Sequence, residues 1–148
     1  MKGARVMIKQ ISVFLENKEG RLAEVTRTLA DNCINIRAMS IADTTDFGIL
    51  RLIVDDPQKA QKVLESAQFT VKIKEVLAVG INDQPGALAK VLDILLEADI
   101  TIEYMYAFLG KCKDMALVIL KLSDNDRAAA SFSQQNVSVI AEEELYNL

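Results

Sequence analysis

The sequence predicts an α+β fold in which one βαββαβ module occurs twice in tandem. Two observations predict it: an internal duplication, and the same order of strand and helix patterns in each copy. With a constant offset of 66 positions, nine identities recur within 27 positions. They are Val13, Gly20, Leu22, Ala23, Val25, Leu29, Ile34, Ile36 and Met39, which recur as Val79, Gly86, Leu88, Ala89, Val91, Leu95, Ile100, Ile102 and Met105. A repeat that keeps a turn glycine, a helix stripe and alternate strand residues indicates one structural unit used twice.

The first copy contains, in order, the patterns of a strand, a helix, two strands, a helix and a closing strand. Its opening strand is rich in β-branched residues and ends in a turn at Gly20. Asp56 and Pro57 mark the start of the second helix, because aspartate caps free N–H groups and proline suits the first helical turn. The expected strands are residues 8–15, 34–42, 47–54 and 70–76, and the apolar helix positions are Leu22, Val25 and Leu29, then Ala60, Val63, Leu64 and Ala67.

The second copy repeats this order after Gly86 with one difference in length. Beyond the central hairpin the offset becomes 68, so that Leu52 corresponds to Leu120. We therefore expect about two extra hairpin residues within 110–113. Either Asp124 or Asn125 can cap the last helix. The expected strands are residues 77–81, 100–108, 115–122 and 137–145, the first helix carries Leu88, Val91, Leu92 and Leu95, and the second spans residues 128–132.

The expected domains are residues 1–76 and 77–148, with no flexible linker between them. The segment 71–79 is almost continuous strand, which predicts a fixed relation between the two modules. Two helices on one face of an antiparallel sheet leave the sheet edges to be covered. Side-by-side pairing into one eight-stranded antiparallel sheet, with the helices on one face, would cover them. Back-to-back packing is the alternative.

Composition and charge narrow the classes of function. The 148 residues are 51% hydrophobic and 26% charged, which is enough for a substantial core. The net charge is −4, and basic and acidic residues are interspersed. This balance disfavours binding to a nucleic-acid backbone, which depends on basic patches. We expect no nucleic-acid partner.

Residue types that carry much enzyme chemistry are missing or isolated. Histidine is absent, which removes the commonest general base and transition-metal ligand. Cys33 and Cys112 share no CxxC context and are expected to be reduced thiols in a cytoplasmic protein. The sequence has no signal-peptide core and no apolar run long enough to cross a membrane. We therefore expect no catalytic residues, metal, cofactor or membrane partner.

The turn that precedes the first helix of each module carries the most informative motif. Residues 17–22 read Asn-Lys-Glu-Gly-Arg-Leu, and residues 83–88 read Asp-Gln-Pro-Gly-Ala-Leu. A helix that begins directly after a glycine turn presents N–H groups and the positive end of its dipole, which suits a carboxylate or phosphate. The alternative is a plain strand-to-helix turn, in which Asn17 and Asp83 cap the helix and glycine supplies a special backbone angle.

A βαββαβ unit with D-x-P-G-x-L at its first turn, and an Asn-Ile pair opening its second strand, resembles the ACT domain. This resemblance covers residues 8–148 and implies ferredoxin-like modules that bind amino acids and regulate other proteins. It places each ligand between the first turn of one module and the second strand of its neighbour. Turn N–H groups would hold the α-carboxylate. The implied ligand-binding residues are Leu15, Asn17, Lys18, Glu19, Gly20, Arg21, Leu22, Asn35 and Ile36, and then Ile81, Asn82, Asp83, Gln84, Pro85, Gly86, Ala87, Leu88, Thr101 and Ile102.

The two copies depart from the family pattern in different ways. Glu19 stands where the second copy has Pro85, and Thr101 stands where the first copy has Asn35. Leu15 and Ile81 occupy a strand end that is polar in some family members. We therefore expect unequal sites that favour an apolar or larger ligand side chain.

A few other residues have two interpretations. Tyr104, which we include among the ligand-binding candidates, lies on a strand with Met105 and Tyr106, and alternation places at least one of the three in the core. Met39 and Met105 recur in both copies and are expected to pack. The residues 142–144, Glu-Glu-Glu, are expected at a solvated strand end, and Lys72 and Lys74 on an outward sheet face.

The resulting hypothesis is a non-enzymatic regulatory protein that binds a free amino acid. The family makes a homodimer the expected assembly. The alternative is a regulatory subunit of a separate amino-acid biosynthetic enzyme, which would be a further partner. A module of the RNA-recognition type shares the βαββαβ order, and residues 46–51 partly resemble its RNP1 strand. The paired aromatic residues that stack on bases are missing there.

Overall fold

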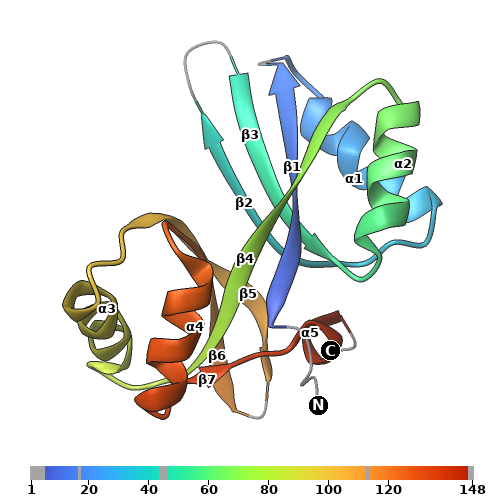
Figure 1. Cartoon of the computed structure of the whole chain (residues 1–148). Helices are drawn as coiled ribbons and strands as arrows, with labels where there is room; N and C mark the ends of the chain where they lie inside the picture. The colour runs from blue at the N-terminus through green and yellow to red at the C-terminus, as the bar shows by residue number, and fades with distance from the viewer. Residues whose placement is uncertain (1–5, 17, 44–46, 113, 147–148) are drawn as a thin grey trace. The chain divides into compact units, whose positions relative to one another are not determined.

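The computed structural model describes residues 6–16, 18–43, 47–112 and 114–146. The chain divides into two compact units, residues 9–74 and residues 75–148 together with the segment up to Ile8. We call them the N-terminal unit and the C-terminal unit. Their elements are labelled in Figure 1.

The N-terminal unit has the predicted order of elements. β1 (Met7–Glu16) pairs antiparallel with β3 (Phe47–Val54), and β3 pairs antiparallel with β2 (Ile36–Asp43). The helices are α1 (Arg21–Asp31) and α2 (Pro57–Ser66), and the unit ends in the first part of β4 (Thr70–Asn82).

The C-terminal unit repeats this order from the second part of β4. α3 (Ala87–Glu97), β5 (Ile102–Cys112), β6 (Met115–Leu122) and α4 (Asn125–Gln134) follow. β6 pairs antiparallel with both β4 and β5. The short β7 (Ser138–Val139) pairs with β4, and α5 (Glu142–Tyr146) comes last.

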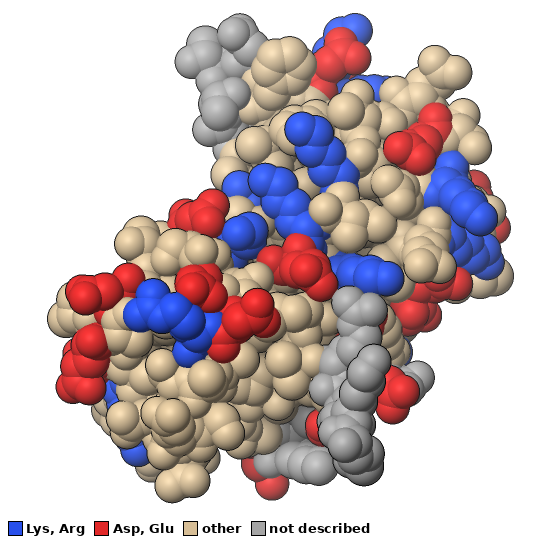
Figure 2. Space-filling model, viewed as in Figure 1, with Lys and Arg blue, Asp and Glu red and all other residues tan. Residues whose placement is uncertain are grey.

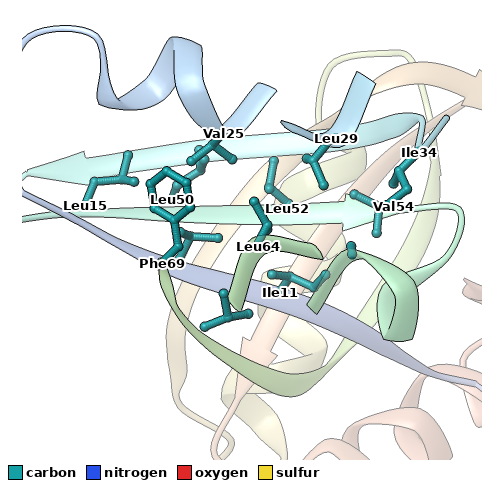
Figure 3. Close-up of a cluster of buried hydrophobic side chains, with 13 residues drawn as sticks. Ile11, Leu15, Val25, Leu29, Ile34, Leu50, Leu52, Val54, Leu64 and Phe69 are labelled. Carbon is teal, nitrogen blue, oxygen red and sulfur yellow. The ribbon is translucent and has the colours of Figure 1, made fainter. Parts of the chain in front are cut away.

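Each unit has its own core, built between its strands and one layer of helices. In the N-terminal unit, alternate residues of β1 and β3 meet Val25 and Leu29 of α1 and Leu64 of α2 (Figure 3). Both helices therefore cover the same face of the strands, because every second strand residue points to one side. The C-terminal core is equivalent, with Leu95 of α3 and Phe132 of α4. Met39 and Met105 pack against these cores, as predicted.

The helix ends confirm the duplication in atomic detail. Asp56 accepts a hydrogen bond from the Lys59 backbone at 3.1 Å, and Asp124 accepts one from the Arg127 backbone at 3.0 Å. The predicted caps are thus present, and Asp124, not Asn125, caps α4. At their other ends, α1, α2, α3 and α4 are each followed by a left-handed residue with the paired backbone hydrogen bonds of a Schellman motif. These residues are Cys33, Gln68, Asp99 and Asn136.

Three expectations about strands were wrong. β4 is one continuous strand of 13 residues, so the described residues form seven strands rather than eight. The last strand has two residues, and residues 142–144 begin α5 instead of ending a strand, because three glutamates favour the first turn of a helix. The two extra residues of the second copy lie between Ala107 and Lys111, where the register shifts, slightly before the predicted place.

The N-terminal segment belongs to a different unit from the one that the repeat suggests. Val6 and Met7 pack against the core of the C-terminal unit. Repeat alignment cannot detect this contact, since the segment precedes the first repeated residue. The domain bounds 1–76 and 77–148 remain a prediction from the repeat.

Candidate functional site

The two turns that open α1 and α3 have the same backbone hydrogen bonds. In the first, the N–H groups of Lys18, Arg21 and Glu24 donate to the carbonyls of Glu16, Lys18 and Gly20, at 2.7, 3.4 and 3.0 Å. In the second turn the same three bonds recur 66 positions later, at 2.9, 3.3 and 3.1 Å; their donors are Gln84, Ala87 and Lys90, and their acceptors are Asn82, Gln84 and Gly86. The sequence identity at the turn thus reflects one backbone geometry used twice.

A left-handed glycine is the N-cap residue of both helices. Gly20 has φ 87° and Gly86 has φ 91°, a conformation in which any side chain causes strain. Because the N-cap residue has no side chain, it cannot fill the space in front of the first helical turn. The glycine supplies the special angle that the structural interpretation requires, and it also leaves the helix N-terminus accessible, as the ligand-site interpretation requires.

The second turn opens onto a pocket. The pocket has a volume of about 390 Å³ and lies within the C-terminal unit. It is bounded by the end of β4, the turn, the start of α3, the first residue of β6 and the segment after α4. The lining residues are Gly80, Ile81, Asn82, Gln84, Pro85, Gly86, Ala87, Lys90, Val91, Met115, Asn136, Val137 and Ser138.

The pocket gathers six of the residues predicted for the second copy: Ile81, Asn82, Gln84, Pro85, Gly86 and Ala87. Four other candidates are not among its lining residues: Asp83, Leu88 and Thr101 are exposed, and Ile102 packs against the core. Tyr104 is half-buried on β5 and does not line it either.

Seven lining residues were not predicted. Gly80, Lys90 and Val91 flank the turn in sequence, whereas the other four come from β6 and from the segment after α4. Lys90 could have been found, since it lies one helical turn after Gly86 and so faces the same end of α3. Asn136 could have been found as the left-handed residue that ends α4, because asparagine tolerates that conformation. Met115 depends on the packing at Gly80, where a Cβ would lie 2.9 Å from its Sδ atom.

The residues that open the second strands are held by a structural clamp. Asn35 donates its N–H to the Asp55 carboxylate at 3.0 Å, and its carbonyl accepts from the Asp55 N–H at 3.1 Å. Thr101 and Ser123 make the same two bonds, at 3.0 and 2.9 Å. The backbone N–H groups of Asn35 and Thr101 are therefore already used, and only their exposed side chains can contribute to a ligand site.

The predicted residues of the N-terminal unit differ in exposure. Lys18, Glu19, Gly20 and Leu22 are exposed, and Leu15 is buried in the core, where half-buried Ile36 also packs. Asn17 lies outside the described residues. Arg21 turns back over the ring of Phe69, with its guanidinium carbon 4.4 Å from the ring centre.

Two carboxylates flank the Arg21 guanidinium. Its Nη1 donates to Glu24 at 2.8 Å, and its Nη2 lies 4.0 Å from Glu16, which also pairs with Lys18 at 3.1 Å. The hydrogen bond and charge of Lys18, together with the charge of Arg21, hold the pKa of Glu16 below its ordinary value of 4.5. Glu16 therefore stays ionised at neutral pH.

Charge and hydropathy add little to this site. Blue and red side chains lie next to one another over the face seen in Figure 2. Within the described ranges, no group of three or more His, Cys, Asp or Glu residues could hold a metal ion. No described helix has the length and hydropathy needed to span a membrane.

The family model of the ACT domain pair matches residues 6–148. The chain belongs to this family. Protein BT0572 from Bacteroides thetaiotaomicron is 44% identical over 97% of this chain and 98% of its own, with a TM-score of 0.90. Regulatory subunits of aspartate kinase share the fold at lower identity. The one from Thermus thermophilus, in its ligand-free form, is 18% identical over 89% of this chain and 94% of its own, with a TM-score of 0.63.

The subunit from Thermus flavus is 15% identical over 90% of this chain and 98% of its own, with a TM-score of 0.58. A search of curated proteins found no match. The sequence resemblance to the ACT family is thus confirmed, and with it the tandem arrangement. The regulatory role remains a prediction. The ligand and the residues that bind it remain predictions.

Proposed function

We propose that this ACT domain pair is a non-enzymatic regulatory protein that binds a free amino acid at the pocket of the C-terminal unit. The observation that supports the proposal most directly is the pocket beside the Gly86 turn. It combines an open helix N-terminus, one lysine, several uncharged polar groups and an apolar side. These are the groups that a zwitterion with a side chain requires.

Each part of an amino acid has a matching part of the pocket. The α-carboxylate suits the first N–H groups of α3 and the ammonium of Lys90. Side-chain oxygens of Asn82, Asn136 or Ser138 can accept hydrogen bonds from the ligand ammonium. The ligand side chain would then lie against apolar residues: Ile81, Val91, Met115 and Val137.

The inter-module sites that the family resemblance implies are the alternative place for the ligand. Their residues come from one turn and from the second strand of the neighbouring module, with Asn35 and Thr101 contributing side chains only. A side-by-side arrangement of the modules and a cytoplasmic homodimer complete the proposed assembly. A ligand would act by favouring one state of a partner or of the assembly over another.

The alternative is a regulatory subunit of a separate amino-acid biosynthetic enzyme. Solved structures named as regulatory subunits of aspartate kinase share the fold of this chain. Affinity purification of the chain from its own host distinguishes the two functions. Recovery of a biosynthetic enzyme at defined stoichiometry supports the subunit function.

A thermal-shift screen with the twenty amino acids tests the proposal. A ligand at a hundred times its Kd stabilises the folded state by about 2.7 kcal/mol. For a chain of this size that moves the transition by roughly 5–10 °C. Lys90→Met should weaken the binding of the hit about tenfold, since the charged contact to the carboxylate is lost.

Lys62→Met is the matched control, because Lys62 is exposed on α2 in the other unit. It should leave the affinity unchanged. No shift with any of the twenty at millimolar concentration would overturn the amino-acid proposal. An equal loss in both lysine variants would move the site away from this pocket.

A further inference from the structure

The pocket of the C-terminal unit has a counterpart in the N-terminal unit that can be traced residue by residue. The two turns share their backbone hydrogen bonds, and the two helices after them share their ends, so equivalent residues occupy equivalent places. Four of the pocket residues therefore identify the corresponding place in the first copy. The pairs are Asn82 with Glu16, Ala87 with Arg21, Lys90 with Glu24, and Val137 with Phe69.

These four counterparts contact one another. Arg21 is the centre of the group: it donates to Glu24 at 2.8 Å, lies 4.0 Å from Glu16 and stacks 4.4 Å above the ring centre of Phe69. In the C-terminal unit the corresponding residues stand around open space instead, because alanine replaces the arginine. The side chain of Arg21 thus occupies the place of the pocket.

Burial of the residues beneath this place supports the same conclusion. Leu15 and Phe69 are 3% and 5% exposed, and both belong to the core of the N-terminal unit (Figure 3). Their counterparts Ile81 and Val137 are only half-buried, and both line the pocket. This difference in burial is expected if the space is filled in the N-terminal unit and open in the C-terminal unit.

We propose that Glu16, Glu24 and Phe69 form a guanidinium site whose occupant is Arg21 of the same chain. We call these three residues the guanidinium site. With Arg21 in place, the equivalent space among the described residues of the first copy is filled, and the chain binds a ligand at the turn pocket of the C-terminal unit. This last clause rests on the proposed function, whereas the guanidinium site does not.

The chemistry of the three residues selects a guanidinium over other cations. A planar guanidinium can stack on an aromatic ring and donate from its edge to carboxylates at the same time. The side chain of Arg21 is 21% exposed, and its Nε is buried without a hydrogen-bond partner in the described part of the chain. The group is therefore held at its two Nη ends and by its face.

The two places also carry opposite charge. Glu16 and Glu24 surround the first, while Asn82 and Lys90 occupy the equivalent positions around the second. Removing Arg21 should therefore create a cavity for a cation, and this cavity should not accept the carboxylate ligand of the C-terminal pocket. The two sites have thus diverged in charge: the guanidinium site holds the cation of Arg21, and the pocket of the C-terminal unit is open to an anion.

Chemical rescue tests the guanidinium site. Arg21→Ala removes the atoms that ethylguanidinium replaces, and ethylguanidinium at low millimolar concentration is the probe. We expect a saturable rise of the thermal transition by roughly 2–5 °C in this variant, and none in the wild-type chain. Ethylammonium should stabilise the variant less, because it cannot stack and donate together. The ring protons of Phe69 should shift in NMR spectra as the probe binds.

Arg21→Met is the matched control, since methionine fills much of the space and covers Phe69. It should not respond to ethylguanidinium. Equal responses of the alanine, methionine and wild-type chains, or no saturable response of the alanine variant, would overturn the proposal. If Arg21→Ala does not fold, the wild-type chain decides: guanidinium signals of Arg21 shifted by the ring of Phe69 support the site, and signals at free-arginine positions overturn it.

The outcome is independent of the amino-acid screen. The rescue experiment uses no natural ligand and reports only on the N-terminal unit. A successful rescue with a flat amino-acid screen would keep the guanidinium site and remove the proposed ligand. A failed rescue with a positive screen would do the reverse.

Discussion

In the N-terminal unit the Arg21 side chain at the start of α1 stacks over Phe69, whereas in the C-terminal unit the turn before α3 opens onto a pocket of about 390 Å³. The backbones of the two turns are the same, down to the left-handed glycine and three hydrogen bonds. The difference comes from a single side chain and its partners. Arg21 fills the first place, and Ala87 leaves the second open.

The comparison separates two requirements of a duplicated module. The framework needs the core, the helix ends and the glycine turn, and both copies keep them. The site depends on residues that the framework does not need, such as those at positions 16, 21 and 24 and at their counterparts 82, 87 and 90. These positions can diverge at little cost to folding, since surface substitutions usually change stability by less than about 0.5 kcal/mol.

The largest expected effect tests whether the frameworks are equivalent. Leu29 and Leu95 are 0% and 1% exposed, at matching positions of α1 and α3. Leu29→Ala and Leu95→Ala should each destabilise the chain by about 2–5 kcal/mol, because each leaves a cavity in a packed core. Urea unfolding followed by circular dichroism measures the loss. A large loss in one variant beside a loss below about 1 kcal/mol in the other would contradict an equivalent framework.

The glycine turns should show a smaller and equally matched effect on stability. An added Cβ meets nothing within 4 Å at Gly20 or Gly86, so the cost of alanine comes from the left-handed backbone alone. Gly20→Ala and Gly86→Ala should each lower the free energy of unfolding by about 1–2 kcal/mol, as measured by thermal unfolding. Asparagine at either position should destabilise the chain less than alanine does, because asparagine tolerates the left-handed conformation.

Ligand binding should separate the same two variants. Gly86 lines the pocket, and a side chain there would enter the space in front of α3. Calorimetry with the amino acid found in the screen should therefore show weaker binding for Gly86→Ala and unchanged binding for Gly20→Ala. Weaker binding in both variants would favour a site that uses both turns.

The fold could be predicted from the sequence because its signals are local and occur twice. The apolar spacing of the helices, the cap at Asp56 and the glycine of each turn depend on neighbours a few residues away. The prediction of the last strand was wrong because it also relied on a local signal. A β-branched stretch predicts a strand, but the chain ends in α5, which packs Leu145 into the interior.

Only the part of the candidate site that lies in one continuous segment could be predicted from the sequence. Six pocket residues belong to one continuous segment, and a turn motif identifies such a segment. Met115 and Asn136 reach the pocket from β6 and from the end of α4, and Phe69, which lies between α2 and β4, meets Arg21 at the start of α1. Such contacts follow from packing between elements, which periodicity does not encode. Arg21 was predicted as a ligand-binding residue, and its contacts with Phe69 and Glu24 led us to propose it instead as the occupant of its own site.

The smallest expected effect concerns the response of the two turns to acid. Lys18 is the main cause that holds the pKa of Glu16 below 4.5, through a hydrogen bond and its charge, and Arg21 adds a weaker attraction. A carboxyl with a lowered folded-state pKa stabilises the fold above about pH 4.5, and this contribution is lost as the pH falls through the lowered value. Asn82, its counterpart, does not titrate.

An NMR titration of the Glu16 carboxyl carbon tests this difference. Lys18→Met should raise the pKa of Glu16 more than Arg21→Met does, because the attraction of Arg21 acts over 4.0 Å and without a hydrogen bond. Ethylguanidinium should also bind Arg21→Ala less tightly as the pH falls through the lowered pKa of Glu16, because protonation of Glu16 removes a negative charge that attracts it. Binding that stays constant from pH 7 to the acid limit of folding would show that the ring of Phe69, and not the carboxylates, holds the cation.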